Sequence, residues 1–233
     1  MLDLCPAGFE EVDRGAIIEL VAYADSDREP LLARAFGEVS ATDVEGGWED
    51  RWREFHRPVQ VGRLWIGPPW ETPPADRVQI VIDPGRAFGT GAHASTRLCL
   101  GLLQRLPPAS CLDVGCGSGV IAIAAAKLGF EPVIAVDVDE EAVEATLRNA
   151  AANGVALRAF RADACVAPLP SAAVAVANLT DELVLRVIPR LDCDAVVAAG
   201  YLCAVSLQLR SFQHVERVIA DGWAADLFER AAQ

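Results

Sequence analysis

The residues best suited to chemistry are an acid and three glycines that follow an apolar run. Asp113 closes that run, and the glycines come at every second position after it: Gly115, Gly117 and Gly119. An Ala-rich amphipathic segment follows, so residues 111–129 predict a strand, a tight turn and a helix. Such a turn is typical of nucleotide binding in a doubly wound α/β domain. The third glycine of the dinucleotide fingerprint would fall at Val120, so the match to an NAD or FAD site is poor.

The position of Asp113 favours a cationic cofactor. A carboxylate two residues before the first glycine would repel a diphosphate, whereas S-adenosylmethionine presents an ammonium and a sulfonium that it attracts. A second apolar run closes with Asp137, as expected of an acid that accepts hydrogen bonds from ribose hydroxyls. We therefore expect S-adenosylmethionine to bind at Asp113, Gly115, Gly117 and Asp137. The alternative for both acids is ordinary turn chemistry at a strand end.

The rest of the chain alternates between strand and helix patterns. After Asp137 the expected elements are a helix over 139–153 with Asp139 as N-cap, a strand over 155–161, a strand that ends at Asn178, a helix after Thr180, a strand over 192–200, a helix over 202–212 and a hairpin about Asp221-Gly222. Ligands of open α/β sheets lie at the carboxyl ends of the strands, so Asn178 is a further candidate. A turn asparagine is the alternative.

The N-terminal third has a different character. Residues 1–45 predict a short α+β appendage with strands over 15–24 and 39–45 and a helix after Asp27. Residues 46–76 predict a helix, with Trp48 and Trp52 on one face, followed by a proline-rich linker. That helix could dock the appendage onto the main domain or face a substrate. We expect the catalytic domain to span 77–233.

Composition excludes several classes of function. The net charge is −13, with 16 acidic against 8 basic residues in positions 1–80, which disfavours binding to nucleic acid and favours a basic partner or simply solubility. The seven cysteines form no CxxC pair, so a zinc site is not expected. Neither a signal-peptide pattern nor an apolar run of about 18 residues is present, so we expect a soluble, cytoplasmic protein without membrane association.

A glycine-rich loop over 85–91 precedes the first helix of the main domain. No Lys-Ser or Lys-Thr pair follows it, which excludes a Walker phosphate loop. Its glycines, with Ser95 and Thr96 at the helix start, suggest backbone and hydroxyl contacts that close over a ligand. As turn and cap residues, however, these positions need no ligand.

The segment DPGRAFGTGAHAST, together with LDVGCGSGVIAIAAAKLG, resembles the PrmA family, which methylates the eleventh protein of the large ribosomal subunit. The similarity extends from about Trp48 to the end of the chain. It implies a Rossmann-like class I fold with a seven-stranded, mostly parallel sheet and one antiparallel strand from the terminal hairpin. It also implies S-adenosylmethionine as methyl donor and a protein amine as acceptor. The family's cofactor contacts correspond to Thr96, Gly115, Asp137 and Asn178.

The resemblance also bears on neighbouring positions. Asp163 falls in a loop where class I methyltransferases commonly contact adenine, with an ordinary turn residue as the alternative. Enzymes that methylate adenine or glutamine nitrogens carry an NPPY-like run where this chain has residues 178–181, NLTD, so a flat acceptor is disfavoured. We therefore expect a monomeric protein N-methyltransferase for lysine or N-terminal amines. Asn178 and the loop Phe88–Gly91 are the candidates for orienting the amine, and no residue stands out as a catalytic base.

The N-terminal segment is short for this family, which usually carries a complete recognition domain there. The acceptor could therefore be a ribosomal protein, another protein or a small amine. A cofactor-binding interaction protein without turnover is the alternative from a different class.

Overall fold

The computed structural model describes residues 9–13, 18–22, 28–37, 39–41, 57–83 and 91–231, in two compact units, Met1–Trp52 and Arg53–Gln233. In the first unit, β1 (Phe9–Asp13) and β2 (Ile18–Ala22) form an antiparallel hairpin, and α1 (Glu29–Phe36) follows. The strand over 15–24 and the helix after Asp27 are confirmed. The sequence analysis missed β1. The predicted strand over 39–45 and the helix that carries Trp48 and Trp52 fall largely or wholly outside the described residues.

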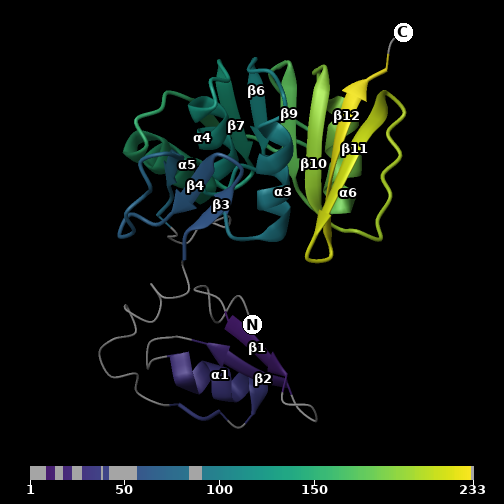
Figure 1. Ribbon diagram of the computed structural model, residues 1–233. Helices are drawn as coiled ribbons and strands as arrows, with labels where there is room; N and C mark the ends of the chain where they lie inside the picture. Colours follow the sequence, from purple (N-terminus) through teal and green to yellow (C-terminus); the bar gives the residue numbers. More distant parts are fainter. Residues whose placement is uncertain are drawn as a thin grey trace. The chain divides into compact units, whose positions relative to one another are not determined.

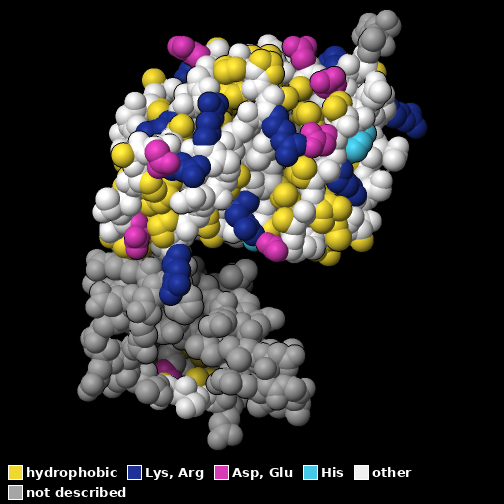
Figure 2. Space-filling model, viewed as in Figure 1, with side chains coloured by type: hydrophobic (Ala, Val, Ile, Leu, Met, Phe, Trp, Pro, Cys, Tyr) yellow, Lys and Arg dark blue, Asp and Glu magenta, His cyan; other side chains and the backbone are white. Residues whose placement is uncertain are grey.

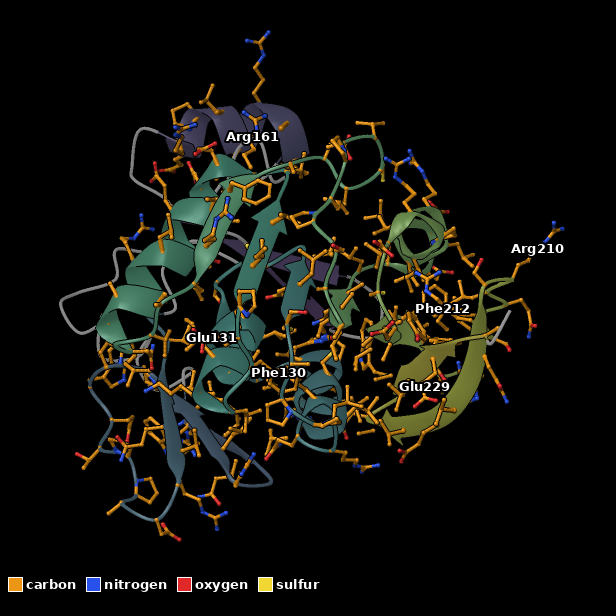
Figure 3. All side chains as sticks on the ribbon, turned by 90° about the horizontal axis from the view of Figure 1, so that it is seen from above. Phe130, Glu131, Arg161, Arg210, Phe212 and Glu229 are labelled. Carbon is orange, nitrogen blue, oxygen red and sulfur yellow. The ribbon has the colours of Figure 1, made fainter. Side chains whose placement is uncertain are left out.

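A seven-stranded sheet dominates the second unit. Its strands are β6 (Cys111–Val114), β7 (Val133–Asp137), β8 (Arg158–Arg161), β9 (Val174–Asn178), β10 (Ala195–Leu202), β11 (Phe212–Ala220) and β12 (Trp223–Arg230). They lie side by side in the order β11-β12-β10-β9-β6-β7-β8 (Figure 1). Seen from above, Arg161 of β8 marks one edge of the sheet, and Phe212 of β11 marks the other (Figure 3). β12 runs antiparallel to both of its neighbours and the other pairs are parallel, which confirms the expected class I arrangement.

Helices cover both faces of this sheet through two apolar clusters. The first cluster joins one face to α3 (Ala94–Leu103), α4 (Val120–Lys127) and α5 (Glu140–Ala152). The second joins the other face to α6 (Asp181–Val187) and the 3-10 turn Ile188–Arg190. Gly154, with φ of 64°, follows α5 as predicted. No helix among the described residues is long and apolar enough to cross a membrane.

A three-stranded sheet precedes the main one. It consists of β3 (Val59–Val61), β4 (Leu64–Gly67) and β5 (Val78–Val81), with β3 and β4 antiparallel and β4 and β5 parallel. Leu64, Ile66 and Ile80 join the first apolar cluster, so this sheet packs against the face that carries α3. The sequence analysis treated this region as linker and missed β3 and β4, because strands of three and four residues give a weak pattern. The boundaries at residues 45 and 76 stay a prediction.

The predicted helix over 202–212 is wrong. Residues 203–211 form turns and irregular structure. Val205, Leu207 and Leu209 pack against the second apolar cluster, and this spacing of two fits an extended segment rather than a helix. Arg217 donates from Nη2 to the carbonyl oxygen of Val205, at 2.7 Å, so part of the backbone is satisfied by a side chain instead of by helical hydrogen bonds.

Candidate functional site

The glycine turn after β6 requires glycine at its alternating positions. Gly115, Gly117 and Gly119 have φ of 77°, 53° and 83°, in the left-handed region that other residues rarely adopt. A Cβ on Gly115 would lie 2.5 Å from Cδ2 of Leu179, and one on Gly119 would lie 2.9 Å from the backbone of Thr146. The amides of Gly115 and Cys116 both donate to the carbonyl oxygen of Val136, at 2.8 and 3.1 Å. The turn is therefore fixed at the end of β7.

Asp113 is a buried carboxylate with one oxygen left unpaired. Its side chain is 1% exposed, and its Oδ2 accepts a hydrogen bond of 3.1 Å from the amide of Ala122 in α4. Its Oδ1 has no hydrogen-bond partner among the described residues. Burial raises the pKa of Asp113 to about 7, although the Ala122 amide lowers it, and the charge of Asp137 adds to the increase. A cation next to Oδ1 would fit this environment.

Asp137 lies at the end of β7, the neighbouring strand. Its Oδ2 accepts from the amide of Gly117, at 3.0 Å, and its Oδ1 accepts from the amide of Asp139, at 3.1 Å. The side chain is only partly buried, and each oxygen keeps a further lone pair, so the carboxylate can still accept from a pair of hydroxyls. Asp139 is the N-cap of α5, as predicted, because its Oδ1 accepts from the amide of Glu141.

Two other candidates meet across the sheet edge. The side-chain amide of Asn178, at the end of β9, donates to Oγ1 of Thr96 in the first turn of α3, at 3.1 Å. Thr96 is 1% exposed, and Oγ of Ser95 lies 2.8 Å from Nδ1 of His93. Both hydroxyls therefore point into the protein. In this arrangement Thr96 positions Asn178, and Ser95 lies against His93 at the start of α3, while a contact of either hydroxyl with a ligand stays a prediction.

Asp163 and Gly91 are the remaining candidates among the described residues. Asp163 is exposed, and its Oδ1 accepts from the amide of Cys165, at 2.8 Å, which is the geometry of the turn-residue alternative. A contact of Asp163 with adenine stays a prediction. Of the loop 85–91 only Gly91 lies among the described residues. It is buried with φ of 88°, and a Cβ there would lie 2.8 Å from Cγ2 of Ile66 in β4.

The sequence analysis missed a connection between α3 and the C-terminal hairpin. His93 is the N-cap of α3, and its ring lies edge-on to the indole of Trp223, with 4.5 Å between ring centroids. Burial and the charge of Arg97 lower the pKa of His93, so the neutral imidazole is favoured. Arg97 also forms an ion pair of 2.5 Å with Asp221 at the hairpin tip. The sequence signal was the histidine two residues before the Ser-Thr pair.

Potential metal ligands are scattered over the part of the chain that the structure describes. The described residues contain no group of three or more His, Cys, Asp or Glu with the geometry for a metal ion. Burial also raises the pKa of Cys116, within the glycine turn, to about 12, so its thiol stays protonated at neutral pH.

The sequence of this chain is similar to that of a known protein family. The family model "Ribosomal protein L11 methyltransferase (PrmA)" matches residues 11–231. A ribosomal protein L11 methyltransferase of Dechloromonas aromatica is 43% identical over 209 residues, which cover 84% of this chain and 69% of that protein. One from Caldicellulosiruptor saccharolyticus is 38% identical and is covered over 60% of its length.

A solved structure has a similar fold. The ribosomal protein L11 methylase from Lactobacillus delbrueckii subsp. bulgaricus superposes with a TM-score of 0.67 at 31% identity, over 76% of this chain and 100% of that one. The family and its class I fold use S-adenosylmethionine as methyl donor. The glycine turn, the acids of β6 and β7 and Asn178 lie at the carboxyl ends of neighbouring strands, and the assignment of these residues to the cofactor stays a prediction. The chain therefore belongs to the PrmA family of S-adenosylmethionine-dependent methyltransferases.

Proposed function

We propose that this protein transfers a methyl group from S-adenosylmethionine to lysine or N-terminal amines of a ribosomal protein, the substrate named for its relatives. The observation that supports the cofactor best is the buried Oδ1 of Asp113, which lacks a partner among the described residues beside a turn that only glycine can form. A carboxylate in this position would destabilise a diphosphate and stabilise a cation.

The residues at the strand ends suit the parts of this cofactor. Asp113 and the glycine turn would hold its cationic portion, and Asp137 would accept hydrogen bonds from its ribose hydroxyls. When bound, the cofactor supplies an electrophilic methyl group on its sulfonium. The work left to the chain is to hold the acceptor nitrogen in line with that methyl group and to exclude water.

The acceptor amine must reach the site in its neutral form. A lysine with an ordinary pKa of about 10.4 first has to lose a proton. The sequence singles out no dedicated base, and Nδ1 of His93 already accepts a hydrogen bond from the Ser95 amide. We propose that Asn178, held by Thr96, orients the nitrogen and that solvent takes the proton.

The proposed partner is a basic protein in the cytoplasm, and we propose that the enzyme acts on it as a monomer and without binding nucleic acid. The acidic excess supports this, because 16 acidic residues stand against 8 basic ones in positions 1–80. The face of the second unit in Figure 2 is not uniformly acidic, since Lys and Arg side chains are scattered over it. Attraction of a basic partner would therefore depend on other parts of the surface.

One experiment tests the proposed function. Purified protein would be incubated with methyl-labelled S-adenosylmethionine and either purified ribosomal protein L11 or a ribosome-depleted lysate, with Asp137→Ala as the control. We expect label on L11 with the wild type, and less label with the variant when the cofactor concentration is low. Label on a different protein or on a small amine would replace the acceptor, and cofactor binding without any labelling would leave a binding protein without turnover.

A further inference from the structure

Two buried polar side chains of α5 and the partly buried side chain of its C-cap lie in a row. Thr146, Asn149 and Asn153 are spaced by three and four residues, so they lie on one side of the helix. Thr146 is 0% and Asn149 is 5% exposed, and their neighbours on this face are apolar. Burying such groups costs free energy unless each finds a hydrogen-bond partner, so the partners show what the row does.

Asn149 bonds to two segments that are far apart in the chain. Its Nδ2 donates to the carbonyl oxygen of Ser118, in the glycine turn, at 2.8 Å. Its Oδ1 accepts from the amide of Asp83, just after β5, at 3.2 Å. One amide side chain thus connects the glycine turn to the segment that leads into the loop 85–91.

The two flanking residues each bind one of these segments. Thr146 donates from Oγ1 to the carbonyl oxygen of Gly117, at 3.1 Å. Asn153 pairs with Val81 of β5 through two bonds, in which its Oδ1 accepts from the amide at 2.8 Å and its Nδ2 donates to the carbonyl at 2.6 Å. Among the three, Asn149 contacts both segments.

We propose that Asn149 is a positioning residue for the cofactor site, and this inference rests on the proposed function. By holding the amide of Asp83 and the carbonyl of Ser118 at once, it fixes where the chain leaves β5 relative to the glycine turn. Gly91, where the chain returns, is already fixed against Ile66 and Val120. Cofactor affinity then depends on a side chain that touches no cofactor atom, because preorganisation of the site depends on its supporting residues.

The test compares Asn149→Ala with Gln104→Ala. Gln104 also makes hydrogen bonds from its side-chain amide to backbone, but two of them go to the same turn between β3 and β4: its Oε1 accepts from the amide of Arg63, at 3.0 Å, and its Nε2 donates to the carbonyl of Val61, at 3.0 Å. Titration calorimetry would measure the Kd for S-adenosylmethionine. Hydrogen exchange with and without the cofactor would follow the amides from Asp83 to Gly91. Kinetics would give KM and kcat.

We expect both variants to have a lower Tm. Only Asn149→Ala should raise the Kd and the KM for S-adenosylmethionine, by about tenfold, with kcat at saturation within about twofold of the wild type. Only this variant should also speed exchange of the Asp83 amide without the cofactor, because that amide loses its acceptor. An unchanged Kd in Asn149→Ala, or an equal increase in Gln104→Ala, would overturn the proposal.

If Asn149→Ala does not fold, a second variant, Asn149→Asp, tests the proposal. Asn149→Asp keeps an acceptor for the Asp83 amide but places a carboxylate oxygen against the Ser118 carbonyl. It should raise the Kd while the exchange of Asp83 without cofactor stays at the wild-type rate, and a wild-type Kd in this folded variant would also refute the inference. If the wild type itself binds no S-adenosylmethionine, the proposed function fails instead, which distinguishes the two.

Discussion

At the scale of single residues, we expect Asp113 to make cofactor binding dependent on pH. Its pKa of about 7 lies above the value of about 3.9 expected in an unfolded chain, so the free folded protein holds a proton on it below pH 7. This protonation favours the fold at low pH, and its contribution to the free energy of unfolding declines as the pH rises from about 4 to 7. A cationic ligand favours the ionised form, so binding should release that proton.

We therefore expect the affinity for S-adenosylmethionine to increase from pH 5.5 to 7 and to level off above pH 7. Calorimetry in two buffers of different ionisation enthalpy at pH 6.5 should show release of roughly three quarters of a proton, given a pKa of about 7. Asp113→Asn should bind weakly at every pH, with no proton release. Equal affinity at pH 5.5 and 7.5 in the wild type would show that the buried acid does not respond to the ligand.

Asp137 gives a second prediction at this scale. Asp137→Ala should weaken cofactor binding by about 1 to 3 kcal/mol, the typical size for lost charged hydrogen bonds. The control is Asp139→Ala, which removes the N-cap of α5 and should lower stability with little effect on affinity. Calorimetric titration measures the cofactor affinity of both variants, and circular dichroism checks that they fold. Unchanged affinity in a folded Asp137→Ala protein would remove this residue from the site.

At the scale of elements, the segment 203–211 depends on Arg217 in β11. Arg217 makes two hydrogen bonds to Asp226, each of 2.8 Å, and its Nη2 also donates to the carbonyl of Val205. Asp226 is buried, and it also accepts from Tyr201. Burial alone would raise the pKa of Asp226, but the hydrogen bonds from Arg217, Tyr201 and His214 outweigh it and lower the pKa. The carboxylate is therefore ionised at neutral pH.

Arg217→Ala should lower the free energy of unfolding by about 2 to 4 kcal/mol, because it leaves a buried charge without its main partner. The matched control is Arg105→Ala. It breaks an exposed ion pair with Glu216, which lies in β11 like Arg217, and should lower the free energy of unfolding by less than about 1 kcal/mol. Urea unfolding at pH 7 measures both changes. The contribution from Asp226 should be lost as the pH falls below about 4, since its folded pKa is lowered. Equal losses in the two variants would contradict the assigned role of Arg217.

Some of the observed elements could be predicted from the sequence and others could not. Apolar runs that close with Asp113, Asp137 and Asn178 predicted three strands correctly, because buried parallel strands are continuous apolar runs, whereas the roles of these three residues stay a prediction. The apolar pattern over 202–212 predicted a helix wrongly. These apolar residues pack as an extended segment, and Arg217 donates a hydrogen bond to its backbone. The role of Asn149 could not be predicted, since its partners lie 31 and 66 residues away and only the fold brings them together.

At the scale of the whole molecule, the division into two units predicts separable functions. Deleting residues 1–52 should abolish methylation of a protein acceptor yet spare cofactor binding, because every described candidate site residue lies beyond position 90. Filter-bound label on the acceptor and calorimetry on the truncated chain measure the two properties. If the truncated chain is folded and methylates the acceptor at the wild-type rate, recognition resides in the second unit.

Charge gives a related expectation for the full chain. Because the net charge is −13, a basic acceptor should be attracted over distances that salt screens, about 8 to 10 Å at physiological ionic strength. Raising the salt concentration from 50 to 500 mM should lower kcat/KM for the protein acceptor and leave the Kd for cofactor nearly unchanged. A rate that does not depend on salt would argue against electrostatic attraction of the partner.

The place of β12 in the sheet has a consequence for the order in which the sheet can form. β12 follows β11 along the chain, yet it lies between β10 and β11, and β11 pairs with no other described strand. Until β12 is in place, β10 keeps an open edge and β11 has no described strand to pair with. The sheet can therefore close only after both strands of the hairpin have been synthesised, and until then the edge of β10 exposes backbone groups that another chain could pair with.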